Sequence, residues 1–487
     1  MLLDILKTVQ VKFYDQLQQV TDQPHLRLVI MPFEQLATLN EGLDLAAQYA
    51  QQKAWGHAKP DQPWTSVLPN GNPIVIVPPY QAQTDLTTWL ADLRQAIKPY
   101  WIDQRPGIIL DGQQADVTSI NAALRVLLAY SASLPNYQQE AQVTGKFISV
   151  IGTSLSTCRE TIAAHQGNAI ARYLSLMPPN YLTPAHYMDL VAYMAEKKGW
   201  EITLYQKHDL HKMGAGAFCA VASACDKAGI VKLSYQPSSS DQANQAPITL
   251  VGKGVCYDTG GLSIKPAQYM QGMHEDMMGS AVALGSFYAL TECQPDYPIT
   301  CYLALTENKI DRQAFLPDSV VTTLAGKTIE ITDTDAEGRL ILLDTMTLAQ
   351  QQDKPCLMID YATLTGTAIK SLDTTHNALF SNHSDWLTDL ISIGSASAEK
   401  AWPFPLDPSY QKKLKSNVAD LKQCEVVGNA DHIYAAKLLE NFVQPSCRWL
   451  HLDLSAGNHD GGLGAIPSDT IAPGVFFTQR LVKHMIG

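Results

Sequence analysis

The sequence predicts an α/β protein of two domains: a smaller N-terminal α/β domain and a larger C-terminal α/β domain with a central mixed sheet flanked by helices. Short apolar runs rich in Val and Ile alternate with helix-like stretches along the chain, which is typical of strands and helices packed in layers. The chain has 487 residues, and at roughly 150 residues per domain this length fits two or three domains. Apolar residues make up 46% of the chain, which is enough for large cores.

The N-terminal part alternates four strand-like runs with helical stretches. The strand-like runs lie at 26–33, 72–80, 106–112 and 146–153, and the helical stretches lie at 85–101 and 117–134. We expect residues 1–155 to form the N-terminal domain, with a role in assembly or regulation. A further helical stretch follows at 158–177. We place a linking helix region at 156–170 and the second domain at 171–487.

The second domain begins with clear helix signals. Thr183 is a good N-cap, Pro184 suits the first helical position and Gly199 follows two lysines as a stop. The remaining pattern predicts strands at 200–206, 230–236, 248–255, 356–366 and 449–457, and helices at 209–224, 276–290, 339–349 and 429–443.

Charge and cysteine content exclude several classes of protein. There are 35 Lys and Arg against 47 Asp and Glu, so the formal charge is −12, which disfavours polyanionic partners such as nucleic acids and anionic membranes. No run approaches the ~20 apolar residues of a membrane helix. The N-terminus carries Asp4 and Lys7 and lacks a signal-peptide pattern. Nine scattered cysteines without a CxxC motif indicate a reduced, cytoplasmic protein.

The first group of candidate functional residues lies between 248 and 276. The apolar run 248–254 ends in Gly-Lys-Gly, which places Lys253 near the carboxyl end of a strand, where the sites of α/β sheets gather. Asp258, Lys265 and Asp276 follow among glycines and apolar residues. Each alone reads as a loop charge or a helix cap. Two lysines and two aspartates within 24 residues point to a site.

A second group of acidic residues lies in TDTDAEGRL. Asp333, Asp335 and Glu337 alternate, so an extended segment would project all three to one side, before a helix that begins near Arg339. Three acids this close repel one another unless a cation lies between them, and hard divalent cations prefer oxygen ligands. No HExxH motif is present. The four carboxylates of Asp258, Asp276, Asp335 and Glu337 suit two ions that share a water.

At these residues the chain resembles a known family. VGKGVCYDTGGLSIKPAQYMQGMHEDMMGSA and TDTDAEGRLILLD resemble the metal-binding core of the leucyl aminopeptidase family, also called cytosol aminopeptidases. The intervals from Lys253 to Asp258, Lys265, Asp276 and Asp335 match the family spacing. A weaker resemblance runs through ARYLSLMPPNYLTP, HKMGAGAFCAVA, IDYATLTGTA and HLDLSAG, and extends over roughly residues 165–487.

The resemblance implies a role for each of these positions. It implies that Lys253, Asp258, Asp276 and Glu337 bind one metal ion, and that Asp258, Asp335 and Glu337 bind a more exchangeable one. Manganese and zinc are the ions that it suggests. Lys265 would be the electrophile that holds the substrate carbonyl oxygen. Arg339 would hold a bicarbonate that relays protons, in keeping with its place at a helix N-terminus.

The remaining positions of the resemblance are apolar or neutral residues, and departures from the family pattern. The resemblance assigns the substrate pocket to Met273, Thr363, Leu364, Gly366 and Ala456, although Met and Thr are also ordinary core and strand residues. Asp333 stands where the family has Asn, and Met278 and Ser280 add volume where the family has small residues. We expect these departures to affect metal or substrate preference and to leave catalysis intact.

The sequence therefore predicts a dimetal aminopeptidase that removes N-terminal, leucine-like residues from peptides, with a metal-bridging water as the nucleophile. The family resemblance also implies a cytoplasmic homohexamer. A metal-dependent phosphoesterase could use the same carboxylates and stays open as an alternative. A secondary DNA-binding role is a further alternative, which the acidic charge disfavours.

Overall fold

The computed structural model describes residues 2–7, 9–20, 25–39, 43–101, 107–138, 147–237, 245–426 and 428–486. The chain forms two compact units. The first comprises residues 1–169 together with 460–469, and the second comprises 170–459 and 470–487. The domain boundaries expected from the sequence stay a prediction. The sequence did not indicate that the short segment 460–469 packs with the N-terminal unit.

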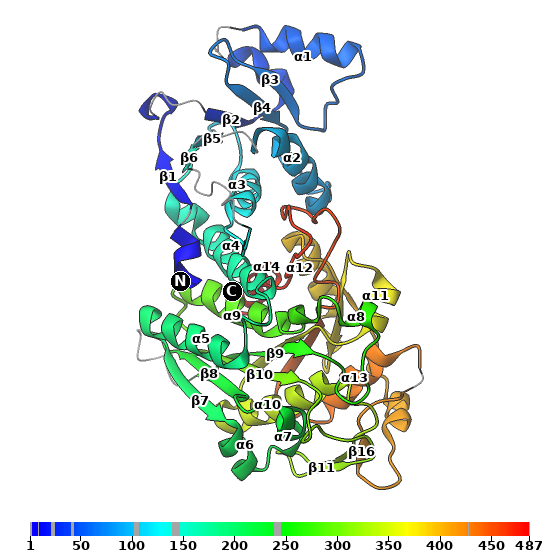
Figure 1. Ribbon diagram of the computed structural model, residues 1–487. Helices are drawn as coiled ribbons and strands as arrows, with labels where there is room; N and C mark the ends of the chain where they lie inside the picture. The colour runs from blue at the N-terminus through cyan, green and yellow to red at the C-terminus, as the bar shows by residue number, and fades with distance from the viewer. Residues whose placement is uncertain are drawn as a thin grey trace. The chain divides into compact units, whose positions relative to one another are not determined.

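The first unit is a six-stranded sheet with helices (Figure 1). The strand order is β1-β6-β5-β2-β4-β3, and only β3 is antiparallel to its neighbour. Its strands are β1 (Gln10–Tyr14), β2 (His25–Ile30), β3 (Trp64–Val67), β4 (Pro73–Val77), β5 (Gly107–Asp111) and β6 (Phe147–Ile151). Its helices are η1 (Leu2–Lys7), η2 (Leu17–Gln19), η3 (Phe33–Thr38), α1 (Leu45–Ala54), α2 (Leu86–Trp101) and α3 (Val117–Ser131).

Arg94 of α2 explains why 460–469 belongs to this unit. Its guanidinium donates hydrogen bonds to the carbonyl oxygens of Gly461 (3.0 Å), Gly462 (3.3 Å) and Ile466. Arg94 is buried, and a buried guanidinium needs such acceptors. The helix α4 (Leu155–Ser175) then contains the boundary between the two units.

The second unit is built on an eight-stranded mixed sheet in the order β15-β14-β17-β13-β9-β10-β8-β7. The four central strands β17, β13, β9 and β10 are parallel, and the outer ones include antiparallel pairs. The strands are β7 (Glu201–Gln206), β8 (Gly229–Tyr235), β9 (Ile248–Asp258), β10 (Ile299–Asn308), β13 (Leu357–Ala362), β14 (Asn377–Ser381), β15 (Ala401–Pro403) and β17 (Arg448–Asp453). The central mixed sheet that the sequence predicts is confirmed.

Helices cover both faces of this sheet. Figure 1 shows α9 (Met278–Glu292) and α10 (Glu337–Asp353) on opposite sides of β9 and β10. The remaining helices are α5 (Pro184–Lys198), α6 (Lys207–Met213), α7 (Gly216–Val221), η4 (Ala222–Ala224), α8 (Ala267–Met270), η5 (Met273–Glu275), α11 (Gly366–Leu372), α12 (Leu387–Ser397), η6 (Pro408–Leu414), α13 (Asp431–Glu440) and α14 (Val475–Ile486). A small sheet joins β11 (Val320–Thr322), β12 (Thr328–Glu330) and β16 (Leu421–Lys422).

Capping residues and glycines explain why one predicted helix is observed and another is interrupted. Helix α5 begins after Thr183, whose hydroxyl accepts a hydrogen bond from the His186 amide at 3.3 Å, and it ends at Gly199 in the left-handed conformation. The single helix expected over 209–224 is wrong. Gly214 has φ 89° and ends α6, so the segment becomes α6, α7 and the short helix η4.

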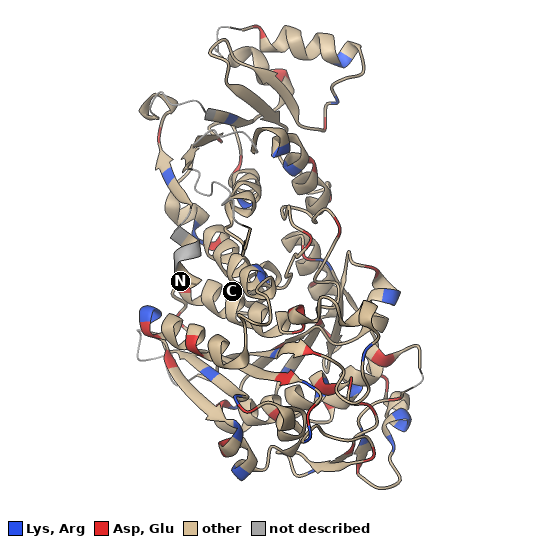
Figure 2. Cartoon of the chain, viewed as in Figure 1, with Lys and Arg blue, Asp and Glu red and all other residues tan. Residues whose placement is uncertain are grey.

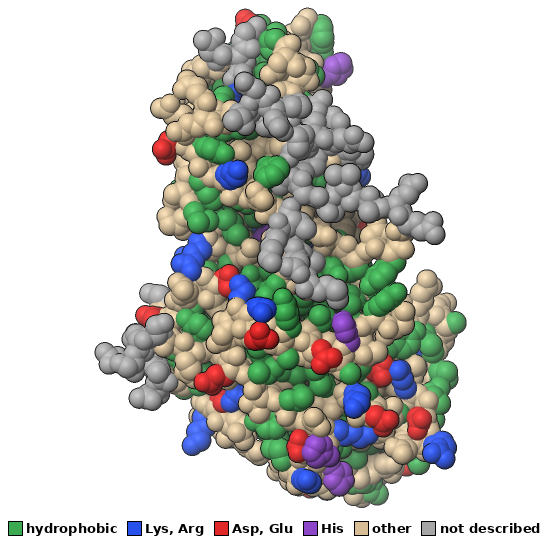
Figure 3. Space-filling view, turned by 60° about the vertical axis from the view of Figure 1, so that its left-hand side comes forward, with side chains coloured by type: hydrophobic (Ala, Val, Ile, Leu, Met, Phe, Trp, Pro, Cys, Tyr) green, Lys and Arg blue, Asp and Glu red, His purple; other side chains and the backbone are tan. Residues whose placement is uncertain are grey.

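Charged residues are distributed over the described chain rather than segregated by sign. Figure 2 shows Lys and Arg interspersed with Asp and Glu along the ribbon. On the face drawn in Figure 3, most basic side chains of the lower part lie near acidic ones. Among the described residues, no helix combines the length and apolar character needed to cross a membrane.

Candidate active site

Strand β9 delivers two of the candidate side chains to the site. Adjacent residues of a strand point to opposite faces. A Cβ on Gly252 would lie 2.7 Å from the Gly279 carbonyl oxygen in α9, so the missing side chain lets this helix approach closely. Lys253 points the other way, toward Gly338 in α10. The Gly-Lys motif thus places an ammonium group beneath the first turn of α10, and Asp258 ends the strand.

The Lys253 ammonium is buried among acceptors. Its Nζ donates to Oδ1 of Asp276 at 2.6 Å and to the Thr363 carbonyl at 2.8 Å, and lies 2.9 Å from Oε1 of Glu337. The side chain is 3% exposed. Burial opposes the charge, but the carboxylates of Asp276 and Glu337 outweigh it and raise the pKa of Lys253. In the absence of a metal ion, Lys253 therefore carries a positive charge.

Lys265 bridges a second pair of carboxylates. Its Nζ lies 2.9 Å from Oδ2 of Asp258 and 2.6 Å from Oδ1 of Asp335. Burial opposes this charge too, and the neighbouring carboxylates raise the pKa of Lys265 above its usual value. The other oxygen of Asp258 accepts hydrogen bonds from the Gly260 amide (2.9 Å) and from Nδ2 of Asn308 (2.8 Å).

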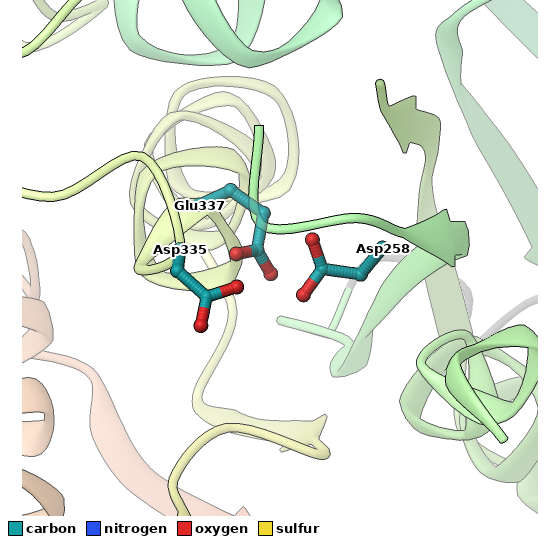
Figure 4. Close-up of side chains that lie close together, drawn as sticks. All are labelled: Asp258, Asp335 and Glu337. Carbon is teal, nitrogen blue, oxygen red and sulfur yellow. The ribbon is translucent and has the colours of Figure 1, made fainter. Parts of the chain in front are cut away.

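Three carboxylates converge next to these lysines. Oxygen atoms of Asp258, Asp335 and Glu337 all lie within 4.8 Å of one another, and Figure 4 shows them pointing toward a common centre from the end of β9 and from the start of α10. Burial and the Asp258 carboxylate raise the pKa of Asp335 to about 7. Burial and the Glu337 carboxylate also raise the pKa of Asp258. Such crowding is costly without a cation.

The donor set fits divalent cations. Oδ2 of Asp276 and Oε2 of Glu337 are buried and have no hydrogen-bond partner within the described part of the chain, and orphaned buried acceptors are rare. Four carboxyl groups, with Asp276 joined through Lys253, face two ammonium groups, so acidic groups outnumber basic ones in the cluster. Hard divalent ions prefer ligands of this kind. The chemistry of the residues present therefore fits divalent cations, and their assignment as metal ligands stays a prediction.

Arg339 lies one half-turn beyond Glu337 in α10, and its charge is already paired. Nη1 and Nη2 donate to Oδ1 and Oδ2 of Asp431 at 3.0 and 2.7 Å, and Nη1 reaches the Gln423 carbonyl at 3.4 Å. The guanidinium is 2% exposed. This parallel pair is the strongest geometry for an arginine and a carboxylate. Neither Asp431 nor Gln423 is predicted from the sequence as a partner of Arg339.

Asp333 is not part of the carboxylate cluster of Asp258, Asp335 and Glu337. The segment before α10 is a turn and not a strand, so the expected alternation is wrong. Oδ1 of Asp333 accepts a hydrogen bond from the Asp335 amide at 2.9 Å, and the Asp333 amide donates to Oε1 of Gln423. Asp333 thus shapes the turn that presents Asp335, and an Asn there could accept the same bond.

The expected substrate-pocket residues lie at different distances from this centre. Thr363 belongs to it, because its hydroxyl donates to Oδ1 of Asp276 at 2.9 Å. Leu364 and Gly366 follow directly, with the Leu364 amide bound to Asp453 and Gly366 opening α11. The Met273 carbonyl accepts a hydrogen bond from the Asp276 amide at 3.4 Å, but the described contacts include none between the side chains of Met273 or Ala456 and the clustered carboxylates. Their assignment to a pocket stays a prediction.

Contacts of Glu275 bring the segments of Met273 and Ala456 together. The Glu275 carboxylate accepts hydrogen bonds from Nδ2 of Asn458 and from the Thr470 hydroxyl (3.2 Å). Met273 begins the same short helix η5, and Ala456 precedes Asn458 by two residues. Glu275 therefore joins the segment before Asp276 to the loop that follows β17.

The two departures in DMMGSA are accommodated inside the second unit. The Met278 side chain is 1% exposed and occupies the space where Gly457 would carry a Cβ. The Ser280 hydroxyl donates to the Met277 carbonyl at 2.7 Å and lies 3.2 Å from the Tyr187 hydroxyl. The added volume therefore packs against Gly457, next to Ala456, and the added hydroxyl is satisfied.

Asn308 is a further site residue that sequence reasoning missed. It ends β10 beside Asp258, is 1% exposed and also donates to the Thr334 carbonyl at 3.0 Å. It therefore holds Asp258 and the turn before Asp335 in register. Its place at the carboxyl end of a predicted central strand was the available signal.

Gly338 is a position where one methyl group should disturb the site. A Cβ there would lie 2.5 Å from Cε and 2.8 Å from Nζ of Lys253, so Gly338→Ala should push the buried ammonium from Asp276 and Glu337. We expect weaker binding of one metal ion, by about tenfold for each ~1.4 kcal/mol lost, in a titration of apo protein with Mn²⁺. Gly428→Ala is the control, since its Cβ would meet nothing closer than 3.5 Å. Equal affinity in both variants would contradict this geometry.

Fold and site together define an α/β enzyme whose centre is suited to divalent cations. Residues 169–470 match the model of the cytosol aminopeptidase family, catalytic domain. A probable cytosol aminopeptidase of Hydrogenovibrio crunogenus is 37% identical over 341 residues, which are 67% of this chain and 68% of that protein. Its counterpart in Wolbachia pipientis is 37% identical over 318 residues, or 64% and 63% of the two chains.

Solved structures agree over a larger share of the chain. The bottromycin maturation enzyme BotP in complex with Mn has a TM-score of 0.80 at 25% identity, covering 94% of this chain and 99% of that one. A leucine aminopeptidase of Caenorhabditis elegans has a TM-score of 0.80 at 24% identity, covering 98% of each chain, and shows the fold alone. The chain belongs to the cytosol aminopeptidase family and is a metalloaminopeptidase.

Proposed function

We propose that this chain is a dimetal aminopeptidase that hydrolyses N-terminal residues, leucine-like ones preferred, from peptides with a free amino terminus. The observation that carries the proposal is a cluster of carboxylates and lysines. Oxygen atoms of Asp258, Asp335 and Glu337 lie within 4.8 Å of one another. Lys253 contacts Glu337, and Lys265 contacts Asp258. Family membership supports the peptidase over the phosphoesterase alternative.

Lys253, Asp258, Asp276, Asp335 and Glu337 would hold the metal ions. Manganese or zinc ions held there would supply Lewis-acid polarisation of a carbonyl and an activated water as the nucleophile. The chain's own residues would do the rest. Lys265, free of its carboxylate partners once metal ions neutralise them, would donate to the oxygen that becomes negative as the carbonyl is attacked.

The other roles follow from position. Thr363 and Asn308 hold Asp276 and Asp258, respectively, in place. Met273, Leu364, Gly366 and Ala456 would line the pocket for the first side chain. The family resemblance implies a bicarbonate at Arg339, whose guanidinium pairs with Asp431 in this structure. The names of the relatives support a cytoplasmic location, and a homohexamer is the assembly that the resemblance implies.

Removal of metal should abolish the activity. We expect hydrolysis of leucine p-nitroanilide to be lost after complete chelation and restored by Mn²⁺ or Zn²⁺, because the carboxylate cluster then lacks its cations. Metal at ~100 times its dissociation constant should also stabilise the fold by about 2.7 kcal/mol, visible as a higher melting temperature. An N-acetylated peptide and p-nitrophenyl phosphate are the matched poor substrates. Turnover that survives metal removal would overturn the mechanism.

A further inference from the structure

The guanidinium of Arg339 already holds a carboxylate of this chain. We propose that Asp431 is the resident carboxylate of the active site: it occupies the anion position of Arg339 and relays protons there, so the enzyme needs no bicarbonate. The proton relay by Asp431 rests on the proposed peptidase function. The binding of Asp431 to Arg339 does not.

The first support is the geometry of the pair. Asp431 is the first residue of α13 and meets Arg339 with both oxygens, at 3.0 and 2.7 Å from Nη1 and Nη2. Bicarbonate presents two oxygens with a similar spacing, so a bicarbonate on this edge of the guanidinium would compete directly with Asp431.

The second support is the cost of displacing Asp431. Arg339 is 2% exposed, and of its remaining donors Nη1 also reaches the Gln423 carbonyl while Nε is buried without a partner in the described residues. Bicarbonate would have to expel a carboxylate that is tethered at a high effective concentration. It would also leave Asp431 without its ion-pair partner, which is costly beside a buried charge.

The third support is the position of Asp431 beside the metal-site residues. The carbonyl of Gln423 meets Arg339, and the side chain of the same residue donates to the Ala336 carbonyl at 2.9 Å, between Asp335 and Glu337. On the other side, the amide of His432 donates to the Thr367 hydroxyl at 2.9 Å, four residues after Thr363. Asp431 is thus fixed between the two segments that supply the site.

A purely structural role would be simpler, because a buried arginine needs a counter-charge and a carboxylate is favourable at a helix N-terminus. Asp431 differs from such a residue in exposure. Its side chain is 27% exposed, and its oxygens make no other hydrogen bond to the described residues. A carboxylate has about four acceptor positions, so about two remain for donors such as water.

The proton balance of hydrolysis needs one such group. A water molecule loses a proton as its oxygen bonds to the peptide carbon. The C–N bond then breaks with its electron pair on nitrogen, and the amine takes up a proton. The Asp431 carboxylate would accept the first proton and deliver it to the amine, so it ends the cycle unchanged.

The test is chemical rescue of the Mn²⁺-loaded enzyme in carbonate-free buffer. Asp431→Ala opens the anion position and should lower kcat by about 10²-fold, the lower end for general acid–base catalysis. Added bicarbonate should restore much of that loss. Asp431→Asn fills the position without supplying a base, so it should be impaired and not rescued. Wild-type activity should not respond to bicarbonate.

A matched control breaks another buried arginine–aspartate pair. Asp111 binds Nη2 of Arg27 at 2.7 Å in the first unit, so any activity that Asp111→Asn loses should not return with bicarbonate. If Asp431→Ala retains wild-type kcat, or loses activity that bicarbonate fails to restore, the relay is refuted. A wild-type enzyme stimulated severalfold by bicarbonate would refute the occupancy of Arg339.

A binding measurement separates this inference from the proposed function. Carbon-13-labelled bicarbonate, followed by NMR in the folded protein, should bind Asp431→Ala and not the wild type, whatever the activity. Saturable binding to the wild type that Arg339→Met abolishes would overturn the inference even if the protein is a peptidase. Failure of the wild type to cleave peptides in either buffer would instead overturn the proposed function.

Discussion

Replacing Lys265 by alanine is expected to lower kcat by about 10²–10³-fold, the usual cost of removing one oxyanion donor. The Lys265 side chain is 14% exposed and its ammonium reaches both Asp258 and Asp335, so it lies at the edge of the carboxylate cluster rather than among its ligands. Once cations neutralise those carboxylates, its proton is available to a developing oxyanion. The fall should appear in kcat more than in KM, because the interaction strengthens only in the transition state.

The control for this variant is a lysine outside the site. Lys327 is exposed and donates to the Asn441 carbonyl, so Lys327→Ala should retain wild-type kcat. Metal content should be measured for both variants, since Lys265→Ala removes a competitor for Asp258 and Asp335 and should not lower metal occupancy. Near-normal kcat in fully metallated Lys265→Ala would refute the electrophile role.

The fold could be predicted where the deciding signals are local. Thr183, Pro184 and Gly199 are sufficient to start and stop α5, because capping involves only neighbouring residues. Gly214 inside a helical stretch does not by itself predict a break, since glycine is only mildly unfavourable in a helix and its positive φ depends on the tertiary structure. The packing of 460–469 on Arg94 joins positions more than 360 residues apart, which no local pattern encodes.

In the candidate site, too, the residues in local motifs could be predicted and their partners distant in sequence could not. The residues expected to bind metal lie in two short segments with distinctive spacing, and the structure brings them together. Their supporting partners are distant in sequence: Asn308 is 50 residues from Asp258, and Asp431 is 92 residues from Arg339. Each is an ordinary polar residue in its local context. Their roles follow only from strand order and helix packing. The sequence therefore predicts an anion at Arg339 through the family resemblance alone and does not indicate Asp431.

Replacing Asp258 by asparagine should disable the metal site while preserving most of the local contacts. Asp258 is 2% exposed. The amide oxygen of Asn could still accept from the Gly260 amide and Nδ2 of Asn308, but an NH₂ group would replace the oxygen that faces Lys265 at 2.9 Å. An amide nitrogen is a poor ligand for hard cations. Metal content should therefore fall, as measured by elemental analysis of the dialysed protein.

Activity of Asp258→Asn should fall by at least about a thousandfold, because metal ions supply several kcal/mol of transition-state stabilisation and each ~1.4 kcal/mol is tenfold in rate. The metal-free variant should melt no lower than metal-free wild type, since burial and Glu337 raise the pKa of Asp258 and make its charge unfavourable. That separates loss of metal from loss of folding. Asp333→Asn is the matched control, because it keeps the hydrogen bond to the Asp335 amide and should retain metal and activity. A fully metallated, active Asp258→Asn would show that the cluster of Asp258, Asp335 and Glu337 is not the metal centre.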